Sequence, residues 1–401
     1  MASSPTNAAA SEAEPTPLPG ALLVNLAPLA PEDLEPALSN IALAFPTQAV
    51  FVALPEAPNV SVQTSFNTLK LLPYPPGTTS STSPVLTAAD FLNTWKLAQE
   101  NNAAACLLLG TESNSLQPDS IRALASAALG ADLTVARYQL GPTEGLVNSA
   151  ILYPVTRSLY GTRPRFPLPL DLGFSLSMAE RLAAAALRLT SGNQDDAFVW
   201  PVAEAAVASY ACTEVEIPTR TFPQPPAPDL NTVLSQVAGS LFADIEAKAV
   251  FWQRMRSPSP VRSITPTPAS FENLPDVAPM LDTFHLAYNN LQELWSLVLP
   301  PQSLLGIKHL SLMQAGEFRM PDSLWARIVY DFALAYRLRT INRGHLLGAL
   351  TPLYLAWVAS HLTLIRKGTA PEQHIEELAQ VFETDKPYLV SRWRWPDRFN
   401  P

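Results

Sequence analysis

The sequence lacks the short motifs by which several large enzyme classes are recognised. It contains no GxGxxG, no GxxxxGK[ST], no HExxH and no GxSxG. Dinucleotide-binding, P-loop, zinc-protease and α/β-hydrolase functions therefore lose their usual support. The five histidines all follow residue 280, and none is spaced with a carboxylate in the way that a metal-ligand pair would be. For each histidine we expect a core or capping role.

Cysteine and positive charge are both scarce. Cys106 and Cys212 are the two cysteines, and they form neither a CxxC motif nor a disulfide framework. This predicts buried free thiols in a reducing, cytoplasmic compartment. Lys and Arg number 26 against 35 Asp and Glu, which gives a net charge of −9. The balance argues against a nucleic acid or an anionic membrane as partner, because both need clustered positive charge.

A secretory signal is also missing from the first residues. Residues 1–19 have neither a basic nor an apolar segment, and we expect a disordered tail there. Residues 346–365 are nearly long enough to cross a bilayer. This run contains Pro352, Ser360 and His361, and polar groups are costly in lipid. We therefore expect a buried central helix and no transmembrane span.

Apolar runs alternate with helical patterns along the first part of the chain. At 401 residues and 47% hydrophobic content, the chain is long and apolar enough for two folded domains. Strands are expected at residues 21–26, 49–54, 69–74, 104–109 and 133–140, and helices at 31–44, 87–101, 117–129 and 146–160. Thr87 and Asp90 have the spacing of a capping box at the start of one helix. The alternation predicts an open, mostly parallel sheet with helices on both faces and ligands at the C-terminal ends of its strands.

A change of composition divides the chain. Residues 256–279 are dense in Pro, Ser and Thr, which is typical of a linker. Only helical patterns follow, over residues 280–299, 323–339, 343–365 and 371–390. The predicted organisation is an α/β domain at residues 20–255, a linker at 256–279 and an all-α domain at 280–401. The helical domain is also a candidate for forming a homo-oligomer.

Three blocks of sequence carry a resemblance to a known family. Residues 148–175, NSAILYPVTRSLYGTRPRFPLPLDLGFS, resemble a signature of GT-A glycosyltransferases related to glucosyl-phosphoglycerate synthase and mannosylglycerate synthase. Residues 229–242 are similar to the helix that leaves their catalytic domain, and residues 322–393 to their helical C-terminal region. The resemblance implies a GT-A-like sheet followed by a helical domain. It also implies hexosyl transfer from a nucleotide-sugar donor to a small hydroxy-acid or related acceptor.

The metal-binding part of the family pattern is degenerate in this chain. Relatives hold Mg²⁺ or Mn²⁺ with an Asp-x-Asp at the end of a central strand, where the ion neutralises the leaving diphosphate. The resemblance aligns Gly110-Thr111-Glu112 with this motif and Thr221 with a family histidine ligand. Glu112 is then the remaining candidate ligand, and we expect a divalent ion to bind weakly or not at all. The family's Gly-Gly before its loop acid is Pro169-Leu170 here.

Two acids match family positions. Asp171 aligns with the acid that follows the family's Gly-Gly, which implies that it orients the donor sugar or the acceptor. The alternative is that it caps the turn before a helix at Ser177. Asp196, or Asp195, matches a second family acid, with the alternative of an N-cap for the next helix.

Three arginines complete the candidate site. Arg157, Arg163 and Arg165 are suited to bidentate binding of a phosphate or carboxylate, and the alternative is that they form structural ion pairs. Two hypotheses about function follow. One is a hexosyltransferase with little or no dependence on a divalent ion. The other is a catalytically inactive paralogue that acts as a binding or scaffold protein, because each lost metal or donor group costs orders of magnitude in rate.

Overall fold

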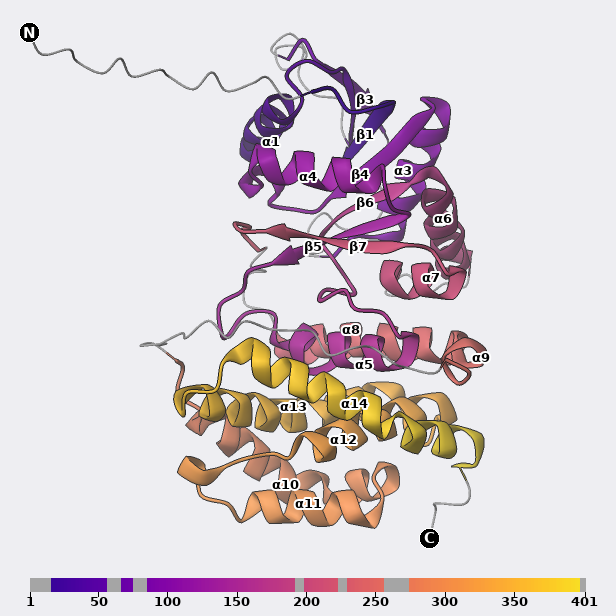
Figure 1. Ribbon diagram of the computed structural model, residues 1–401. Coiled ribbons are helices and arrows are strands. Elements are labelled where there is room, and N and C mark those ends of the chain that lie inside the picture. Colours follow the sequence, from indigo (N-terminus) through magenta and orange to yellow (C-terminus); the bar gives the residue numbers. More distant parts are fainter. Residues whose placement is uncertain are drawn as a thin grey trace, which may run out of the picture.

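The computed structural model describes residues 16–55, 66–74, 85–191, 198–222, 229–255 and 274–396. A sheet with its covering helices forms one end of the molecule, and a stack of helices forms the other end (Figure 1). Most of the predicted tail and linker, residues 1–15 and 256–273, lie outside the described residues.

Seven strands form one sheet in the order β3-β2-β1-β4-β6-β5-β7. They are β1 (Ala21–Leu26), β2 (Val50–Leu54), β3 (Leu69–Pro73), β4 (Ala103–Leu109), β5 (Leu133–Tyr138), β6 (Asp171–Ser175) and β7 (Cys212–Ile217). All neighbouring strands are parallel except β6, which runs antiparallel to both β4 and β5. The predicted mostly parallel sheet is confirmed. It also contains β6 and β7, two strands that the sequence did not predict.

Helices cover both faces of the sheet. One face carries α1 (Pro31–Ala44) and α4 (Pro118–Ala128), and the other carries α3 (Ala88–Glu100), α6 (Leu176–Ser191) and α7 (Pro201–Ala208). Leu23 and Val24 of β1 enter opposite cores, as the two-residue period of a strand requires. The predicted fold class, a GT-A-like mostly parallel sheet with helices on both faces followed by an all-α region, is confirmed in these architectural terms.

Two local predictions about helix ends are also confirmed. The Asp90 carboxylate accepts hydrogen bonds from the backbone N–H and the hydroxyl of Thr87, at 2.7 and 2.8 Å, and the capping box starts α3. The helix predicted to end at residue 160 does end there, as α5 (Tyr153–Tyr160), and Gly161 follows it in the left-handed conformation, with φ 65°, which glycine adopts without steric cost.

The helical end of the molecule combines segments from both halves of the chain. Its members before the predicted linker are η2 (Asn148–Leu152, a turn of π-helix), α5, α8 (Leu230–Ala247) and α9 (Ala249–Trp252). Its later members are α10 (Ala278–Val298), α11 (Pro301–Ser311), η3 (Ala315–Glu317), α12 (Asp322–Leu338), α13 (Arg343–Arg366) and α14 (Pro371–Arg394). α5 packs on α14, and α8 packs on α12 and α13, in one shared hydrophobic core. The division into domains at residue 255 stays a prediction, and the helical core extends across it.

α13 is the central helix of this layer. Among the described residues it is the one helix long and apolar enough to cross a membrane, and 78% of its most apolar stretch is buried inside the molecule. Pro352, Ser360 and His361 are all buried within it. The prediction of a buried central helix is confirmed.

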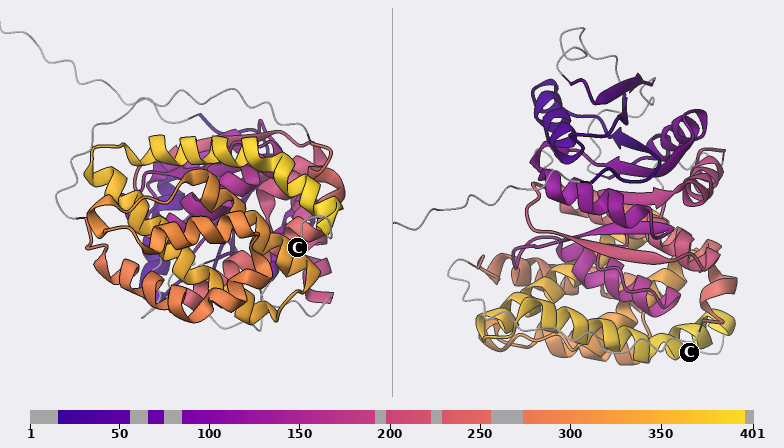
Figure 2. Two further views of the ribbon diagram at one scale, coloured as in Figure 1. Left: turned by 90° about the horizontal axis from the view of Figure 1, so that it is seen from below. Right: turned by 45° about the horizontal axis from the view of Figure 1, so that its top comes forward.

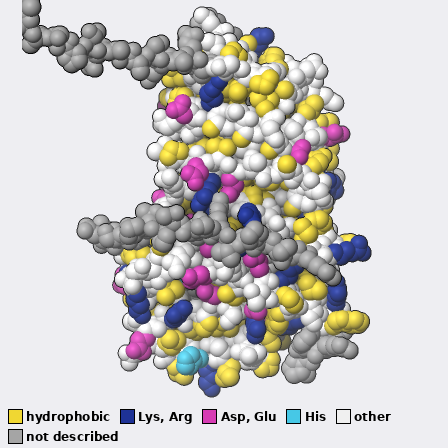
Figure 3. Space-filling view, viewed as in Figure 1, with side chains coloured by type: hydrophobic (Ala, Val, Ile, Leu, Met, Phe, Trp, Pro, Cys, Tyr) yellow, Lys and Arg dark blue, Asp and Glu magenta, His cyan; other side chains and the backbone are white. Residues whose placement is uncertain are grey.

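The two thiols are free and poorly reactive. Cys106 of β4 is buried, whereas Cys212 is only half-buried because β7 is an edge strand. Burial raises the pKa of each thiol to about 12, which keeps both protonated. On the face shown in Figure 3, acidic and basic side chains of the described surface are interspersed.

Candidate functional site

The C-terminal ends of three strands meet the start of a fourth at one edge of the sheet. β4 ends at Leu109, β5 at Tyr138 and β7 at Ile217, while antiparallel β6 begins at Asp171, opposite Leu109. Open α/β sheets bind ligands at this edge. The reversed direction of β6 brings Asp171 to this edge. Because Asp171 lies in a strand and α6 begins five residues later, the alternative that it caps a turn before a helix is wrong.

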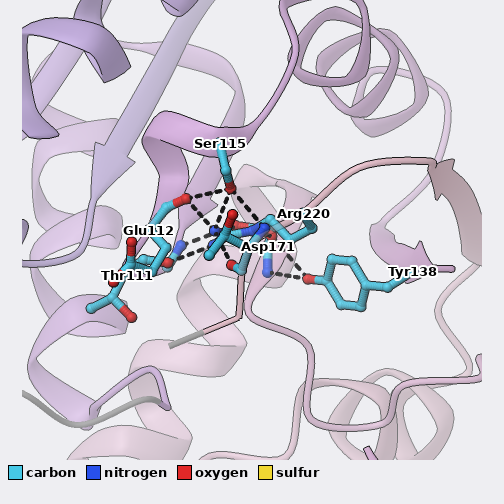
Figure 4. Close-up of polar contacts among 8 residues, drawn as sticks. Thr111, Glu112, Ser115, Tyr138, Asp171 and Arg220 are labelled. Atoms are coloured by element: carbon cyan, nitrogen blue, oxygen red, sulfur yellow. Dashed lines mark hydrogen bonds and ion pairs between the residues drawn. The ribbon is translucent and has the colours of Figure 1, made fainter. Parts of the chain in front are cut away.

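Both oxygens of the Asp171 carboxylate are engaged inside the protein (Figure 4). Oδ1 accepts from the Gly110 N–H and from Arg220 Nη2, each at 3.1 Å. Oδ2 accepts from the Tyr138 hydroxyl at 2.9 Å and from Arg220 Nε at 2.7 Å. The residue is 0% exposed. These contacts provide the pairing that a buried carboxylate needs.

The remaining donors of Arg220 bind the loop that follows β4. Nη1 donates to the carbonyls of Glu112 and of Thr221 and, at 3.2 Å, to Ser115 Oγ, and Nη2 donates to the Thr111 carbonyl at 2.7 Å. A guanidinium has five N–H groups in a fixed plane. Together with the Asp171 pair, these contacts satisfy all five, and the side chain is 1% exposed.

The charges of this cluster are balanced. Burial alone would lower the pKa of Arg220, but the attraction of Asp171 outweighs it, so the pKa lies above its ordinary value and the guanidinium stays charged. Burial and the neighbouring Asp171 raise the pKa of Tyr138 well above its usual range. Tyr138 is therefore a protonated donor, and the Asp171–Arg220 pair has no net charge to offer a ligand.

The residues at this edge do not fit a divalent ion. Among the residues that the structure describes, no three His, Cys, Asp or Glu side chains lie close enough to hold a metal. Glu112 lies beside Arg220, whose positive charge would repel a cation there. A Cβ added at Gly110, which the resemblance aligns with the first metal-binding carboxylate, would lie 2.9 Å from the Leu170 carbonyl oxygen. No side chain is accommodated there without a backbone shift.

Arg157 is bound to α14. Nη1 donates to Glu376 at 2.6 Å, and Nε and Nη2 donate to Glu383 at 3.0 and 3.2 Å. The Arg157 side chain is 3% exposed. These pairs join the helix of the signature block to the C-terminal helix. Phosphate binding by Arg157 stays a prediction, and it would require both ion pairs to open.

Arg165 and Arg163 differ in exposure. Arg165 is buried and donates to Glu372 at 3.1 and 3.2 Å and to Ser149 Oγ at 2.8 Å. Its guanidinium also lies over the Tyr153 ring, 5.1 Å from the centroid. Arg163 is exposed. The three arginines were predicted to bind a phosphate together. In the structure, Arg157 and Arg165 form ion pairs with glutamates of α14.

The remaining predictions concern the second candidate acid and the histidines. Asp195 and Asp196 lie outside the described residues. His361 and His374 are buried, with their Nδ1 atoms 2.6 Å apart, and His374 Nε2 lies 3.1 Å from the Asp322 carboxylate. The core role predicted for the histidines is confirmed for this pair.

The sequence analysis missed Arg220 and Tyr138. Arg220 directly precedes Thr221, the position aligned with a family histidine ligand. That neighbouring position was the one signal in the sequence that could have pointed to Arg220. Tyr138 had no signal beyond its place at a strand end.

Comparisons with known proteins add one similarity. No protein-family model matches the chain, and no curated protein matches it. Solved structures of glucosyl-3-phosphoglycerate synthase from Mycobacterium tuberculosis are similar. For the complex with Mn²⁺, UDP and phosphoglyceric acid, the TM-score is 0.35 and the identity 12%, over 57% of this chain and 78% of that chain. For the complex with UDP, the values are 0.34 and 13%, over 57% and 80%. At this level the similarity does not by itself assign an activity.

Proposed function

We propose that this chain is a glycosyltransferase-like protein that is catalytically inactive and acts as a binding or scaffold protein. The observation that carries the proposal is the saturated Asp171–Arg220 pair at the C-terminal edge of the sheet. The resemblance to GT-A enzymes implies that a nucleotide-sugar donor would place its diphosphate at this edge. Here a buried guanidinium fills the edge, and its donors are committed to the protein.

The electrostatics support the same proposal. Hexosyl transfer requires positive charge to stabilise the leaving diphosphate. The charge of Arg220 is neutralised by Asp171 at 2.7 Å, and the loop carbonyls of Thr111 and Glu112 take its other donors. A diphosphate would therefore have to break a buried ion pair before it gained any stabilisation.

Calorimetric titration with UDP, GDP, UDP-glucose and GDP-mannose tests the proposal. Each ligand is titrated with Mn²⁺ and again with EDTA, and release of nucleoside diphosphate from each sugar donor is followed with glycerate and phosphoglycerate as acceptors. We expect no binding and no turnover in either condition. Micromolar binding of a donor together with acceptor-dependent release of diphosphate would overturn the proposal.

A second candidate is a hexosyltransferase that needs no divalent ion. It is favoured by the same residue, because Arg220 places a positive charge next to the aligned position of the family histidine ligand. Nucleotide-sugar and small acceptor would then be the ligands, and Arg220 would exchange Asp171 for the diphosphate. In that case turnover persists in EDTA and is lost in Arg220→Met, whereas Arg137→Met on β5, whose pair with Glu216 is solvent-exposed, leaves it unchanged.

A further inference from the structure

A hollow lies where three helices end on one side of the molecule. Its volume is about 490 Å³, within the range of about 300–1,000 Å³ that small-ligand sites occupy. Figure 1 places α7, α9 and the C-terminal end of α8 side by side there, and the right-hand view of Figure 2 shows the same arrangement of these red to salmon segments. The apolar lining consists of Val207, Ala247, Val250, Phe251 and Met255. The charged residues of the lining are both basic, Lys248 and Arg254.

The hollow is remote from the Asp171–Arg220 pair. Val207 precedes the first residue of β7 by five positions, whereas Arg220 follows its last residue by three. The two sites therefore lie toward opposite ends of a six-residue strand, which is about 20 Å long. A ligand in the hollow would not touch the sheet edge on which the proposed function depends.

The walls of the hollow are fixed by contacts with the helical core. Trp252 is 0% exposed and anchors α9 in that core. Phe251 stacks on Tyr160, with ring centroids 6.2 Å apart. Lys386 Nζ donates to the Met255 carbonyl at 2.9 Å and so holds the segment that follows α9. A wall that is already ordered loses little conformational entropy when a ligand binds to it.

Most of the charge beside the hollow is balanced within the protein. Arg181 and Arg188 pair with the buried Glu204 at 2.9 and 3.6 Å. Lys248 pairs with Glu204 at 3.0 Å and also with Asp244. Three positive charges thus meet two negative ones, and the charge left over offsets the partial negative charges of the C-terminal ends of α7 and α8, about half an elementary charge each. This network is close to neutral and offers no free charge to a ligand.

Arg254 is the basic lining residue that stands outside this network. Its side chain is exposed, and within the described part of the chain no carboxylate forms an ion pair with its guanidinium. Val250, which lines the same hollow, is 68% exposed. Apolar surface and one available positive charge therefore stand together at the mouth of the hollow. A guanidinium binds a carboxylate through two parallel hydrogen bonds.

We propose that the hollow binds one small amphipathic carboxylate, with its apolar part against Phe251 and Val250 and its carboxylate on Arg254. Sugars and nucleotides fit this lining poorly, because their polar groups would be buried against apolar side chains without partners. A cationic amphiphile is disfavoured by the charge of Arg254. The ligand class is therefore different from the nucleotide-sugar of the GT-A enzymes that the sequence resembles.

Calorimetric titration of the full chain with decanoate tests the proposal. We expect one decanoate per chain. Octanoate and hexanoate should bind more weakly, by up to about fourfold for each methylene removed, because each buried methylene contributes to binding. Decyltrimethylammonium has the same apolar chain with the opposite charge, and it should bind at least about 10-fold more weakly. Absence of decanoate binding up to about 1 mM, or equal binding of the cationic chain, would overturn the proposal.

Two exposed positions locate the bound carboxylate. Arg254→Gln removes the available charge and should raise the decanoate Kd about 10-fold. Val250→Glu sets a negative charge at the mouth of the hollow and should raise the Kd at least as much. Both side chains are exposed, so circular dichroism should show an unchanged fold. A decanoate Kd that neither variant changes would overturn the proposal.

Arg319→Gln is the matched control, because Arg319 is also exposed. Arg343 at the start of α13 pairs with Glu246, next to the hollow, whereas the residue after Arg319 contacts Ser360, about 25 Å farther along α13. The decanoate Kd of this variant should equal that of the wild type, and an increase equal to that of Arg254→Gln would overturn the proposal. Sedimentation velocity tests for a protein occupant. A wild-type dimer that Val250→Glu dissociates and decanoate does not would assign the hollow to a second copy and overturn the proposal.

Discussion

Replacing Arg220 by methionine tests whether the Asp171–Arg220 pair holds the sheet edge together. Methionine keeps much of the side-chain volume and removes the charge, so the Asp171 carboxylate keeps only the Tyr138 hydroxyl and the Gly110 N–H. Asp171 is 0% exposed, and removing one partner of a buried ion pair costs about 3–5 kcal/mol. A loss of about 4 kcal/mol lowers the folding equilibrium constant roughly a thousandfold.

The assay is urea unfolding followed by far-ultraviolet circular dichroism, for Arg220→Met, Asp171→Leu and the double variant. The double variant should lose less than the sum of the two single losses, because neither charge is then left unpaired. Arg137→Met is the control, since Arg137 pairs with Glu216 at 3.4 Å and Glu216 is 70% exposed. Such an exposed pair contributes less than about 1 kcal/mol. If Arg220→Met loses no more than this control, the pair does not stabilise the edge and the reasoning fails.

Three further predictions concern acid, backbone packing and the helical layer. Burial lowers the pKa of His361 to about 3 in the folded chain, whereas in the unfolded chain the imidazole takes up a proton as the pH falls below about 6.5. Between neutral pH and pH 5 the wild type should therefore lose about 2 kcal/mol of stability that His361→Gln does not lose. Urea unfolding at the two pH values measures this difference. Gly110→Asp should bind no Mn²⁺ in calorimetry and should lower the thermal midpoint, because its Cβ would meet the Leu170 carbonyl at 2.9 Å; Mn²⁺ binding would contradict this. Arg157→Met should cost about 3–5 kcal/mol in urea unfolding, because the buried Glu376 loses its positively charged partner and keeps only the Tyr153 hydroxyl. A loss under about 1 kcal/mol would contradict the structural role of the pair.

Elements with strong local signals could be predicted from the sequence. The bounds of α1 follow from Pro31 and the acids of its first turn, and Thr87 and Gly161 mark a helix start and a helix end by their own chemistry. β7 was missed although its Glu214 and Glu216 alternate with apolar residues, which is the two-residue period of a half-buried strand. α11 was missed because it is short and buries only Ser303, Ile307 and Leu310, which leaves little apolar period to recognise.

The site could be predicted only where a motif marked it. Asp171 was found through the signature block, and the sheet edge through the alternation of strands and helices. Arg220 is 49 residues from Asp171 in sequence, and no local pattern links them. The antiparallel direction of β6 creates the contact, and a five-residue strand gives no signal of its direction.

The residues at the sheet edge depend on one another. A divalent ion carries two charges and exchangeable ligands, so it can hold protein carboxylates and a diphosphate together, whereas a guanidinium offers one charge and a fixed plane of donors. In this chain those donors are used within the protein, and Gly110 lets Leu170 approach the end of β4. A carboxylate at position 110 would clash with Leu170, and removing Arg220 would leave the charge of Asp171 unpaired. On the proposal of an inactive scaffold, the edge therefore stabilises the fold and offers no free positive charge to a diphosphate.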